Sequence, residues 1–398
     1  MAHPLPEPST LLSSIRSSSR LARQNANITI SSQAIERLLK SPAFLVSFER
    51  VSAQHGLALP LKFSSPLDEL NVISILSLLN FGSGYRIPLH AETGRGAWDN
   101  IRLLVFAMFI GGSEEDLLSA QGMQQLNEAK VAELMRVNVY IEKPHKDIPG
   151  VTVGELGGPL YELVKLISSV LVETGQLLQK AGYPNLGAFV AEALKEGARH
   201  TKPRTSDVQV FLDRLIRFIP AFQDCHIVDG RPIYIFKKAL FLAHAITIRF
   251  GSISSPSFPV PDTSLVPVFA DNVLPSLLVH LGVIELSPSP SFQSILQDVN
   301  LSPEKLQSLL TEMSPELESN VSPPNEGPAV TMDQIYILRA AALDACEMIV
   351  EKARELDEPS WIKDIRYTSL DMWLWSIAKD RADYRRLGRF SLRDTVFF

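Results

Sequence analysis

A carboxylate stands at the start of an apolar segment in the second half of the chain. Asp271 precedes Pro275, and the apolar run closes at Gly282. Aspartate is a preferred N-cap residue because its oxygens accept hydrogen bonds from the unpaired amides of the first helical turn. Proline is tolerated in that turn because its missing amide hydrogen would have no partner there. Asp271 is therefore either a helix cap, which the local pattern favours, or a catalytic carboxylate held rigidly at a helix start.

A second stretch mixes glycines with aromatic and basic side chains directly after a predicted buried helix. It comprises Asn80-Phe81-Gly82-Ser83-Gly84-Tyr85-Arg86-Ile87-Pro88-Leu89-His90, with Arg95 shortly beyond. Such a composition is typical of a functional loop, and equally of a connector with a glycine helix cap. Phe81 either stacks on a flat base or belongs to the core. Arg86, His90 and Arg95 either clamp a phosphate or are exposed. The spacing fits neither a Walker loop nor a dinucleotide-binding GxGxxG motif.

Composition excludes several classes of protein. The chain has 398 residues, 45% of them hydrophobic, and a net charge of −6, which argues against general binding of nucleic acid. Two cysteines are too few for a disulfide framework, eight scattered histidines form no metal-binding pattern, and no serine-hydrolase elbow is present. No apolar run is long enough to span a bilayer, and residues 1–10 lack a secretory signal. We expect a cytoplasmic protein without metal, cofactor or membrane contact.

The periodicity of apolar residues predicts a mainly α-helical fold with one short β-hairpin around Asp229-Gly230. Strong helix starts are Ser65-Pro66, and Thr331, which opens a capping box. We expect residues 1–10 to form a flexible tail, residues 11–398 to form one large helical domain, and a loop at 314–328 to be disordered. The other predicted helices cover residues 13–27, 32–54, 98–110, 113–121, 127–136, 159–180, 186–199, 206–219, 236–250 and 361–386.

Several short motifs occur in order along most of the chain. They are Ser18-Ser19-Arg20-Leu21-Ala22 with Asn25, Leu79-Asn80-Phe81, the segment from Phe218 to Asp224, Phe236-Lys237-Lys238-Ala239, Phe269-Ala270-Asp271, Arg339 with Glu347, and Leu370-Asp371 with Leu374-Trp375. Together they resemble the queuosine salvage family, the hydrolases that release queuine from queuosine 5′-monophosphate. Two stretches depart from the family pattern: Gly82–Tyr85 replaces a further aromatic residue, and Ile335–Ile337 replaces acidic ones.

The resemblance implies a fold like that of the helical DNA glycosylases and a catalytic role for Asp271. Lys237 would act with it, by contacting the sugar phosphate or by favouring the ionised carboxylate; the alternative is a solvated lysine at a helix end, which we expect of Lys238. Asp224 would contact the substrate or cap a turn. Trp375 and Arg339 fit packing and ion-pair roles better than contact with the substrate. The candidate substrate-binding residues are Phe81, Tyr85, Arg86, His90, Asp224, Arg339 and Asp380.

Three functions remain open at this stage. The first is a nucleotide N-glycosidase of the queuosine salvage type, with a small nucleotide as its partner and no direct contact with nucleic acid. The second is a catalytically idle helical protein that binds a modified nucleoside or another partner. The third is a glycosidase of an ordinary nucleoside monophosphate. Retention of Asp271 and Lys237 favours the enzyme, whereas the altered loop at Gly82–Tyr85 keeps the alternatives open. The oligomeric state is also left open.

Overall fold

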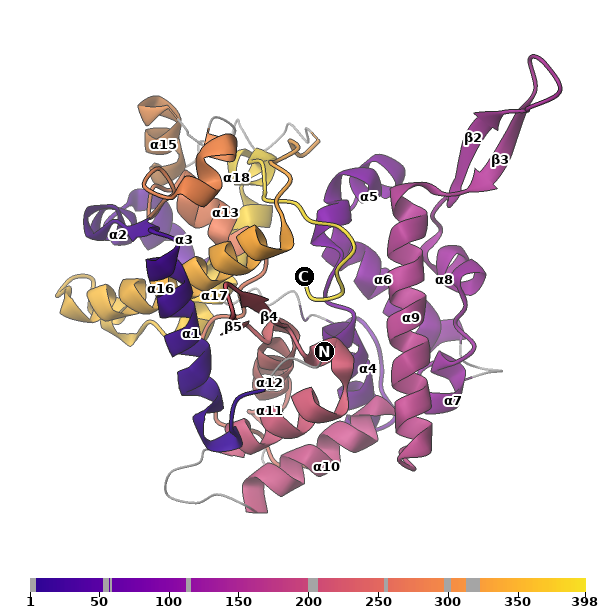
Figure 1. Cartoon of the computed structure of the whole chain (residues 1–398). Coiled ribbons are helices and arrows are strands. Elements are labelled where there is room, and N and C mark those ends of the chain that lie inside the picture. Colours follow the sequence, from indigo (N-terminus) through magenta and orange to yellow (C-terminus); the bar gives the residue numbers. More distant parts are fainter. Residues whose placement is uncertain are drawn as a thin grey trace.

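The computed structural model describes residues 5–52, 57, 59–111, 116–199, 207–253, 257–296, 302–312 and 323–398. Helices make up most of this part of the chain (Figure 1), which confirms the predicted mainly α-helical fold. They are α1 (Leu11–Asn25), α2 (Ser32–Leu39), α3 (Pro42–Ser52), α4 (Pro66–Leu78), α5 (Arg86–Thr93), α6 (Ala97–Gly111), α7 (Ala120–Met123), α8 (Glu128–Met135), α9 (Gly158–Lys180), α10 (Leu186–Arg199), α11 (Asp207–Phe218), α12 (Lys237–Phe250), α13 (Val273–His280), α15 (Pro303–Leu310), α16 (Met332–Glu355), α17 (Tyr367–Asp380) and α18 (Ala382–Arg386).

Three antiparallel strand pairs accompany the helices. The predicted hairpin is β4 (Cys225–Val228) with β5 (Arg231–Tyr234), and its turn residues have positive φ angles of 48° and 73°, as the Asp-Gly pair requires. The described residues form two further strand pairs that the sequence did not predict. β1 (Thr29–Ile30) pairs with β6 (Ile284–Glu285), and β2 (Tyr140–Pro144) pairs with β3 (Thr152–Leu156). The β2–β3 hairpin projects from the body (Figure 1), so its strands lack the one-sided burial that produces a readable alternation.

Local capping fixes the start of two central helices. The amide of Asp68 donates to Ser65 Oγ at 3.2 Å at the start of α4. At the start of α16, Gln334 N donates to Thr331 Oγ1 at 3.2 Å and Thr331 N donates to Gln334 Oε1 at 2.9 Å. The predicted capping box is confirmed.

Some helix boundaries differ from those predicted. The stretch 32–54 is divided into α2 and α3 at Pro42, because a proline disfavours helical backbone in the residue before it. The stretch 361–386 contains a short 3₁₀ helix, α17 and α18. Residues 314–322 of the predicted disordered loop and residues 1–4 of the predicted tail lie outside the described residues. Residues 5–10 lead into a 3₁₀ turn at Pro8–Thr10. The domain boundary at residue 11 stays a prediction.

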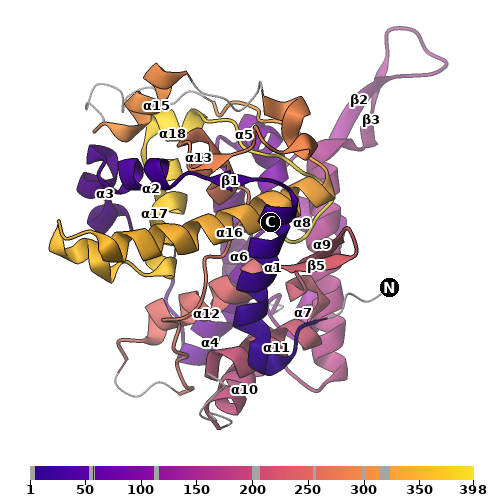
Figure 2. The same cartoon turned by 60° about the vertical axis from the view of Figure 1, so that its left-hand side comes forward.

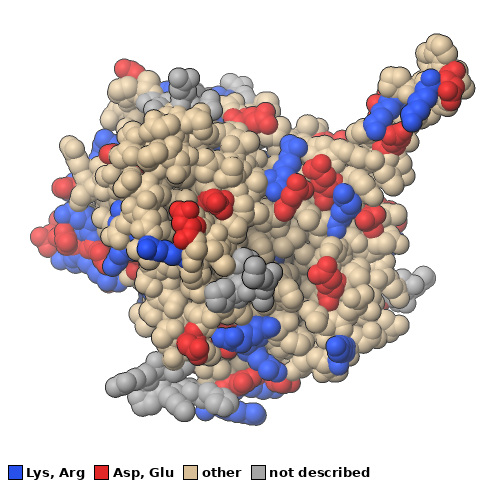
Figure 3. All heavy atoms as spheres, in the orientation of Figure 1, with Lys and Arg blue, Asp and Glu red and all other residues tan. Residues whose placement is uncertain are grey.

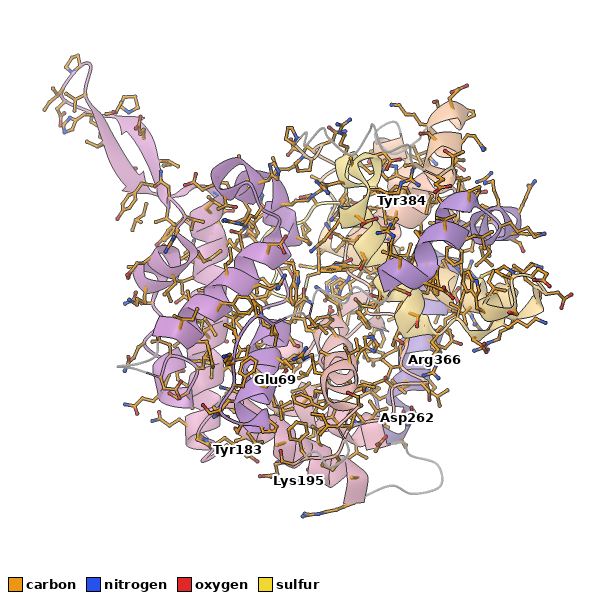
Figure 4. The ribbon with its side chains drawn as sticks, turned by 180° about the vertical axis from the view of Figure 1, so that it is seen from behind. Glu69, Tyr183, Lys195, Asp262, Arg366 and Tyr384 are labelled. Carbon is orange, nitrogen blue, oxygen red and sulfur yellow. The ribbon has the colours of Figure 1, made fainter. Side chains whose placement is uncertain are left out.

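The helices form two groups with α12 between them. In Figure 1, α4 to α9 lie on one side, whereas α1 to α3 and α13 to α18 lie on the other, and the last residues of the chain run between the groups. α1 lies across α16 (Figure 2), and α4 packs against both α10 and α12. Figure 4 shows Glu69 of α4 and Tyr384 of α18 in opposite groups.

Several helices, among them α4 and α12, are buried on nearly all faces over part of their length. Every residue of α4 from Leu70 to Leu78 is buried, as is every residue of α12 from Lys237 to Ile246. A helix that is buried all round lies inside the core rather than on its surface. The C-terminal end of α4 and the N-terminal end of α12 therefore meet inside the molecule.

Within the described residues, no single helix has the length and apolar character to cross a membrane; one pair, Pro66–Leu78 with Ser83–Thr93, meets the criterion only when joined across a 67° bend. Acidic and basic side chains are scattered over the face shown in Figure 3.

Candidate active site

A cavity of about 300 Å³ opens where the end of α4, the start of α12, the start of α13 and α17 come together. Six of the residues singled out in the sequence as candidates for catalysis or binding line it. They are Phe81, Arg86, His90, Arg95, Lys237 and Asp271. The cavity therefore gathers segments that are up to 318 positions apart, from Asn80 to Phe398 (398 − 80).

Asp271 lies just before α13 and lines the cavity. Its Oδ1 accepts a hydrogen bond from Val273 N at 2.6 Å, so it satisfies a free amide at the start of α13. Its Oδ2 has no hydrogen-bond partner among the described residues, and the side chain, only 6% exposed, lines the cavity. One oxygen thus fixes the carboxylate in place, and the other remains for a ligand.

Lys237 is the first residue of α12 and faces the same cavity. Its Nζ donates to Asn80 O at 2.7 Å and to Asn80 Oδ1 at 3.0 Å, so two of its donors are used and one remains. With 4% exposure it is not a solvated helix-end lysine. Burial lowers the pKa of Lys237 to about 8, an effect that the negative charge of Asp271 opposes. The residue before it, Phe236, has a φ of 48°, a conformation that costs about 1–3 kcal/mol in a bulky residue.

A buried ion pair lies behind these two residues. Arg339 Nη1 and Nη2 donate to the two oxygens of Asp224 at 2.9 and 2.5 Å, and both side chains have no exposed surface. Tyr336 Oη donates to Asp224 Oδ1 at 2.7 Å. Neither Asp224 nor Arg339 lines the cavity. We therefore assign these residues a role in supporting the cavity walls rather than in contacting the substrate. The ion-pair alternative for Arg339 is the one observed.

A second carboxylate lies close to Asp271. Asp371 of α17 is buried, and its Oδ2 accepts a hydrogen bond from Phe269 N at 2.9 Å. Burial raises the pKa of Asp371 well above its usual range, and the neighbouring charge of Asp271 raises it further. Burial and the neighbouring charge of Asp271 therefore both favour the protonated form of the Asp371 carboxyl.

Aromatic rings form one wall of the cavity. Phe81, Trp98, Trp375 and Phe398 all line it, and Trp98 meets Trp375 edge to face with ring centroids 6.0 Å apart. Phe81 is 3% exposed, so it belongs both to the core and to the cavity wall. Aromatic faces of this kind bind flat heterocyclic rings by stacking.

Cations gather on another part of the lining. Arg86, Lys379, Arg385 and Arg389 all line the cavity. Burial lowers the pKa of Arg86 to about 9, helped by Arg389 and Arg385, and lowers that of Arg389 to about 10. Burial lowers the pKa of Lys379 to about 7, against the opposing charge of Asp99, and its Nζ lies 3.7 Å from the centroid of the Trp375 ring. Positive groups whose charge is disfavoured by burial and by one another form a favourable site for an anion.

Two further candidate residues do not reach the cavity. Tyr85 is buried in the core, and its Oη accepts a hydrogen bond from Asp394 N at 3.2 Å. Asp380 points to the surface, where it forms an ion pair with Arg50 at 2.7 Å. The structure therefore places neither residue where it was predicted to contact the substrate. Tyr85 packs against the last residues of the chain, and Asp380 pairs with Arg50 at the surface.

The glycines of the loop, Gly82 and Gly84, allow close packing against other parts of the chain. A Cβ atom on Gly84 would lie 2.0 Å from Leu392 O, so only glycine fits against this part of the chain. At Gly84 the close approach to the backbone is made by the segment after α18.

Sequence reasoning missed most of the cavity lining contributed by the end of the chain. Lys379, Arg385, Arg389 and Phe398 were not singled out, and Trp375 was taken as a packing residue. A signal was present, because five basic and two aromatic residues lie within Lys379–Phe390. A charged run of this kind is more often a solvated face, and nothing local shows that it turns inward. No group of three or more His, Cys, Asp or Glu side chains suited to a metal ion occurs in the described part of the chain.

The fold and the cavity define a mainly helical protein whose pocket offers a fixed carboxylate, an aromatic wall and a cluster of cations. Comparison with known families is consistent with this class. The family model described as queuosine salvage protein matches residues 200–308, a segment that contains Lys237 and Asp271. The resemblance seen in the motifs is thereby confirmed over that segment, and the match supports a role in queuosine salvage. None of the curated proteins matches the chain.

Proposed function

We propose that the protein is a hydrolase that cleaves the N-glycosidic bond of queuosine 5′-monophosphate and releases queuine. The observation that carries the proposal is the position of Asp271 in an enclosed cavity, with aromatic rings and cations on the remaining walls. A nucleotide with a flat base, a sugar and a phosphate has one chemical group for each of these surfaces. The family match over residues 200–308 supports the same substrate class.

Cleavage of an N-glycosidic bond builds positive charge on the anomeric carbon. A preorganised carboxylate stabilises that charge, or attacks the carbon to give a covalent intermediate that water then hydrolyses. Asp271 suits either course, because Val273 N fixes one of its oxygens and leaves the other without a partner among the described residues. The hydrogen bond from Arg339 Nε to Ala270 O, 2.8 Å long, holds the preceding residue in place.

The departing base needs a different kind of help. Queuine is a 7-deazaguanine and lacks the basic N7 at which purine bases are protonated. Stacking against Phe81, Trp98 or Trp375 would hold the ring, and hydrogen bonds to its pyrimidine edge would stabilise the charge that it acquires. The Lys237 ammonium keeps one donor after its two bonds to Asn80, and Lys237 lines the same cavity as Asp271.

The phosphate would lie against the cations. Arginine side chains bind phosphate oxygens through pairs of parallel hydrogen bonds. Arg389 Nε is buried and has no hydrogen-bond partner in the described part of the chain, and Arg389 lines the cavity. A bound phosphate would supply the acceptor that this group lacks.

The proposal is tested with three compounds: queuosine 5′-monophosphate, queuosine and guanosine 5′-monophosphate. The purified protein is incubated with each, and the free base is measured by chromatography. We expect base from queuosine 5′-monophosphate in large excess over the other two. Equal release from guanosine 5′-monophosphate would instead establish a general nucleotide glycosidase. Tight binding of queuosine 5′-monophosphate without any release would establish a binding protein.

A further inference from the structure

The last residues of the chain form part of the cavity wall. Phe398 lines the cavity, is 1% exposed, and its carbonyl accepts a hydrogen bond from Gly82 N at 3.0 Å. Further back, Val330 N donates to Ser391 O at 3.0 Å, so this segment contacts both helix groups. Figure 1 shows it running between them.

A buried lysine, Lys238, donates a hydrogen bond to this segment. Lys238 has no exposed surface, and its Nζ donates to Leu78 O at 2.9 Å and to Val396 O at 2.6 Å. Leu78 is the last residue of α4, where carbonyl groups have no partner within the helix. One amino group thus pairs with a carbonyl at the end of a buried helix and, at the same time, with a backbone carbonyl two residues before Phe398.

Aromatic rings surround the amino group. The distances from Lys238 Nζ to the ring centroids of Phe81, Phe222 and Phe397 are 5.2, 5.8 and 5.8 Å. Such contacts offset part of the free energy lost when an ammonium group leaves water. Phe81 is itself a cavity residue. Lys238 therefore contacts both a residue of the cavity wall and the segment that carries Phe398.

Burying a lysine side chain completely is unfavourable, because its charged form loses its hydration. Lysine is almost never fully buried without partners, and burial lowers the pKa of Lys238 well below its usual range. A neutral amine retains two donor hydrogens, which is the number that the two carbonyl acceptors require. The contacts are therefore available in either protonation state. A leucine or methionine would fill the space but would leave both carbonyls unpaired.

We propose that Lys238 is a positioning residue that holds residues 394–398 against the end of α4 and thereby places the Phe398 ring as a wall of the cavity. The expectation from sequence was a solvated lysine, and its complete burial contradicts that expectation. The inference rests on the proposed function only for its effect on the reaction; the contact itself is tested separately.

The experiment compares the wild type with Lys238→Met, and with Lys180→Met as a matched control on the exposed end of α9. Hydrogen exchange of peptides that cover residues 391–398 is followed by mass spectrometry. We expect exchange to accelerate about tenfold or more in Lys238→Met, which corresponds to loss of roughly 1.4 kcal/mol of local stability, and to stay at the wild-type rate in Lys180→Met. Wild-type protection of this segment in a folded Lys238→Met protein would overturn the inference.

The reaction supplies a second readout. With queuosine 5′-monophosphate, we expect Lys238→Met to raise KM about tenfold and to change kcat by less than threefold, because the cavity wall is displaced while Asp271 is untouched. Phe398→Ala should raise KM similarly without accelerating exchange at residues 391–394. If Lys238→Met does not fold, Phe398→Ala decides, and an unchanged KM in that variant overturns the assignment of the wall. If the wild type releases no base, the proposed function fails, and the exchange experiment still decides the role of Lys238.

Discussion

The carboxylate of Asp224 and the guanidinium of Arg339 form a bidentate ion pair that links the two segments carrying Lys237 and Asp271. Asp224 Oδ2 accepts a hydrogen bond from Lys237 N at 3.1 Å, and Arg339 Nε donates to Ala270 O at 2.8 Å. Both side chains are completely buried. The pair therefore sets the distance between the start of α12 and the start of α13, on which the geometry of the cavity depends.

Breaking this pair should destabilise the whole protein. In Asp224→Asn, the Arg339 charge would remain buried without its counter-ion, and the loss of one partner of a buried pair typically costs about 3–5 kcal/mol. Chemical denaturation measures the change in free energy of unfolding. The matched control is Asp380→Asn, which breaks the surface pair with Arg50 and should cost about 1 kcal/mol or less. Equal losses in the two variants would contradict the supporting role of Asp224.

The pH dependence of stability should report the burial of Lys237. Its pKa of about 8 in the folded protein lies below the ordinary value of 10.5. The unfolded chain therefore binds the proton more tightly between these values, and folding becomes more favourable as pH rises from about 8 to 10.5. The difference between the two pKa values corresponds to a gain of at most about 3 kcal/mol in the free energy of unfolding over this pH range.

The variant that isolates this contribution is Lys237→Met. We expect its stability relative to the wild type to be greatest near pH 7 and to fall as pH rises toward 10, because only the wild type gains stability over that range. Urea denaturation at pH 7, 8.5 and 10 measures the difference. A difference that stays constant with pH would show that Lys237 titrates at its ordinary value in the folded protein.

The sequence predicted those parts of the fold that local chemistry decides. The start of α4 at Ser65-Pro66, the capping box of α16 and the Asp229-Gly230 turn each depend on residues a few positions apart. The location of the loop at Phe81 and Arg86 beside Asp271 was also expected, and both residues line the cavity. Their roles in catalysis and binding remain predictions.

The parts that the sequence did not predict depend on contacts between distant segments. Lys238 reads as a solvated residue next to Lys237, and only the ends of α4 and of the chain, which supply Leu78 O and Val396 O, make its burial possible. Similarly, Lys379 and Arg389 become cavity residues because α17 and the segment after α18 turn toward Asp271. No local pattern encodes such long-range packing.

The affinity for a nucleotide should depend on the charge of Lys379. Its pKa of about 7 means that the positive charge is lost as pH rises through neutrality, whereas a phosphate monoester, with a second pKa near 6, is already a dianion there. We expect KM for queuosine 5′-monophosphate to rise between pH 6.5 and 8.5. In Lys379→Met, KM should be roughly tenfold higher at pH 6.5, as expected for loss of one hydrogen bond to a charged group, and should rise less with pH.

Two controls accompany this measurement. Lys180→Met removes an exposed lysine and should keep the wild-type KM at each pH. The affinity for queuosine, which lacks the phosphate, should change little with pH in either variant. If Lys379→Met retains the full pH dependence of KM, another group is responsible, and Lys379 does not contact the phosphate.

The most direct measurement of the central claim is base release by Asp271→Asn. Asparagine caps helices about as well as aspartate, so the hydrogen bond from Val273 N should persist and Tm should stay within a few degrees of that of the wild type. The loss of negative charge should reduce release of queuine from queuosine 5′-monophosphate by 10²-fold or more, while the nucleotide still binds. Asp371→Asn, the same change at the neighbouring buried carboxylate, should retain activity within about tenfold because burial and the charge of Asp271 already favour the neutral form of Asp371. Normal turnover by a folded Asp271→Asn protein would contradict the account.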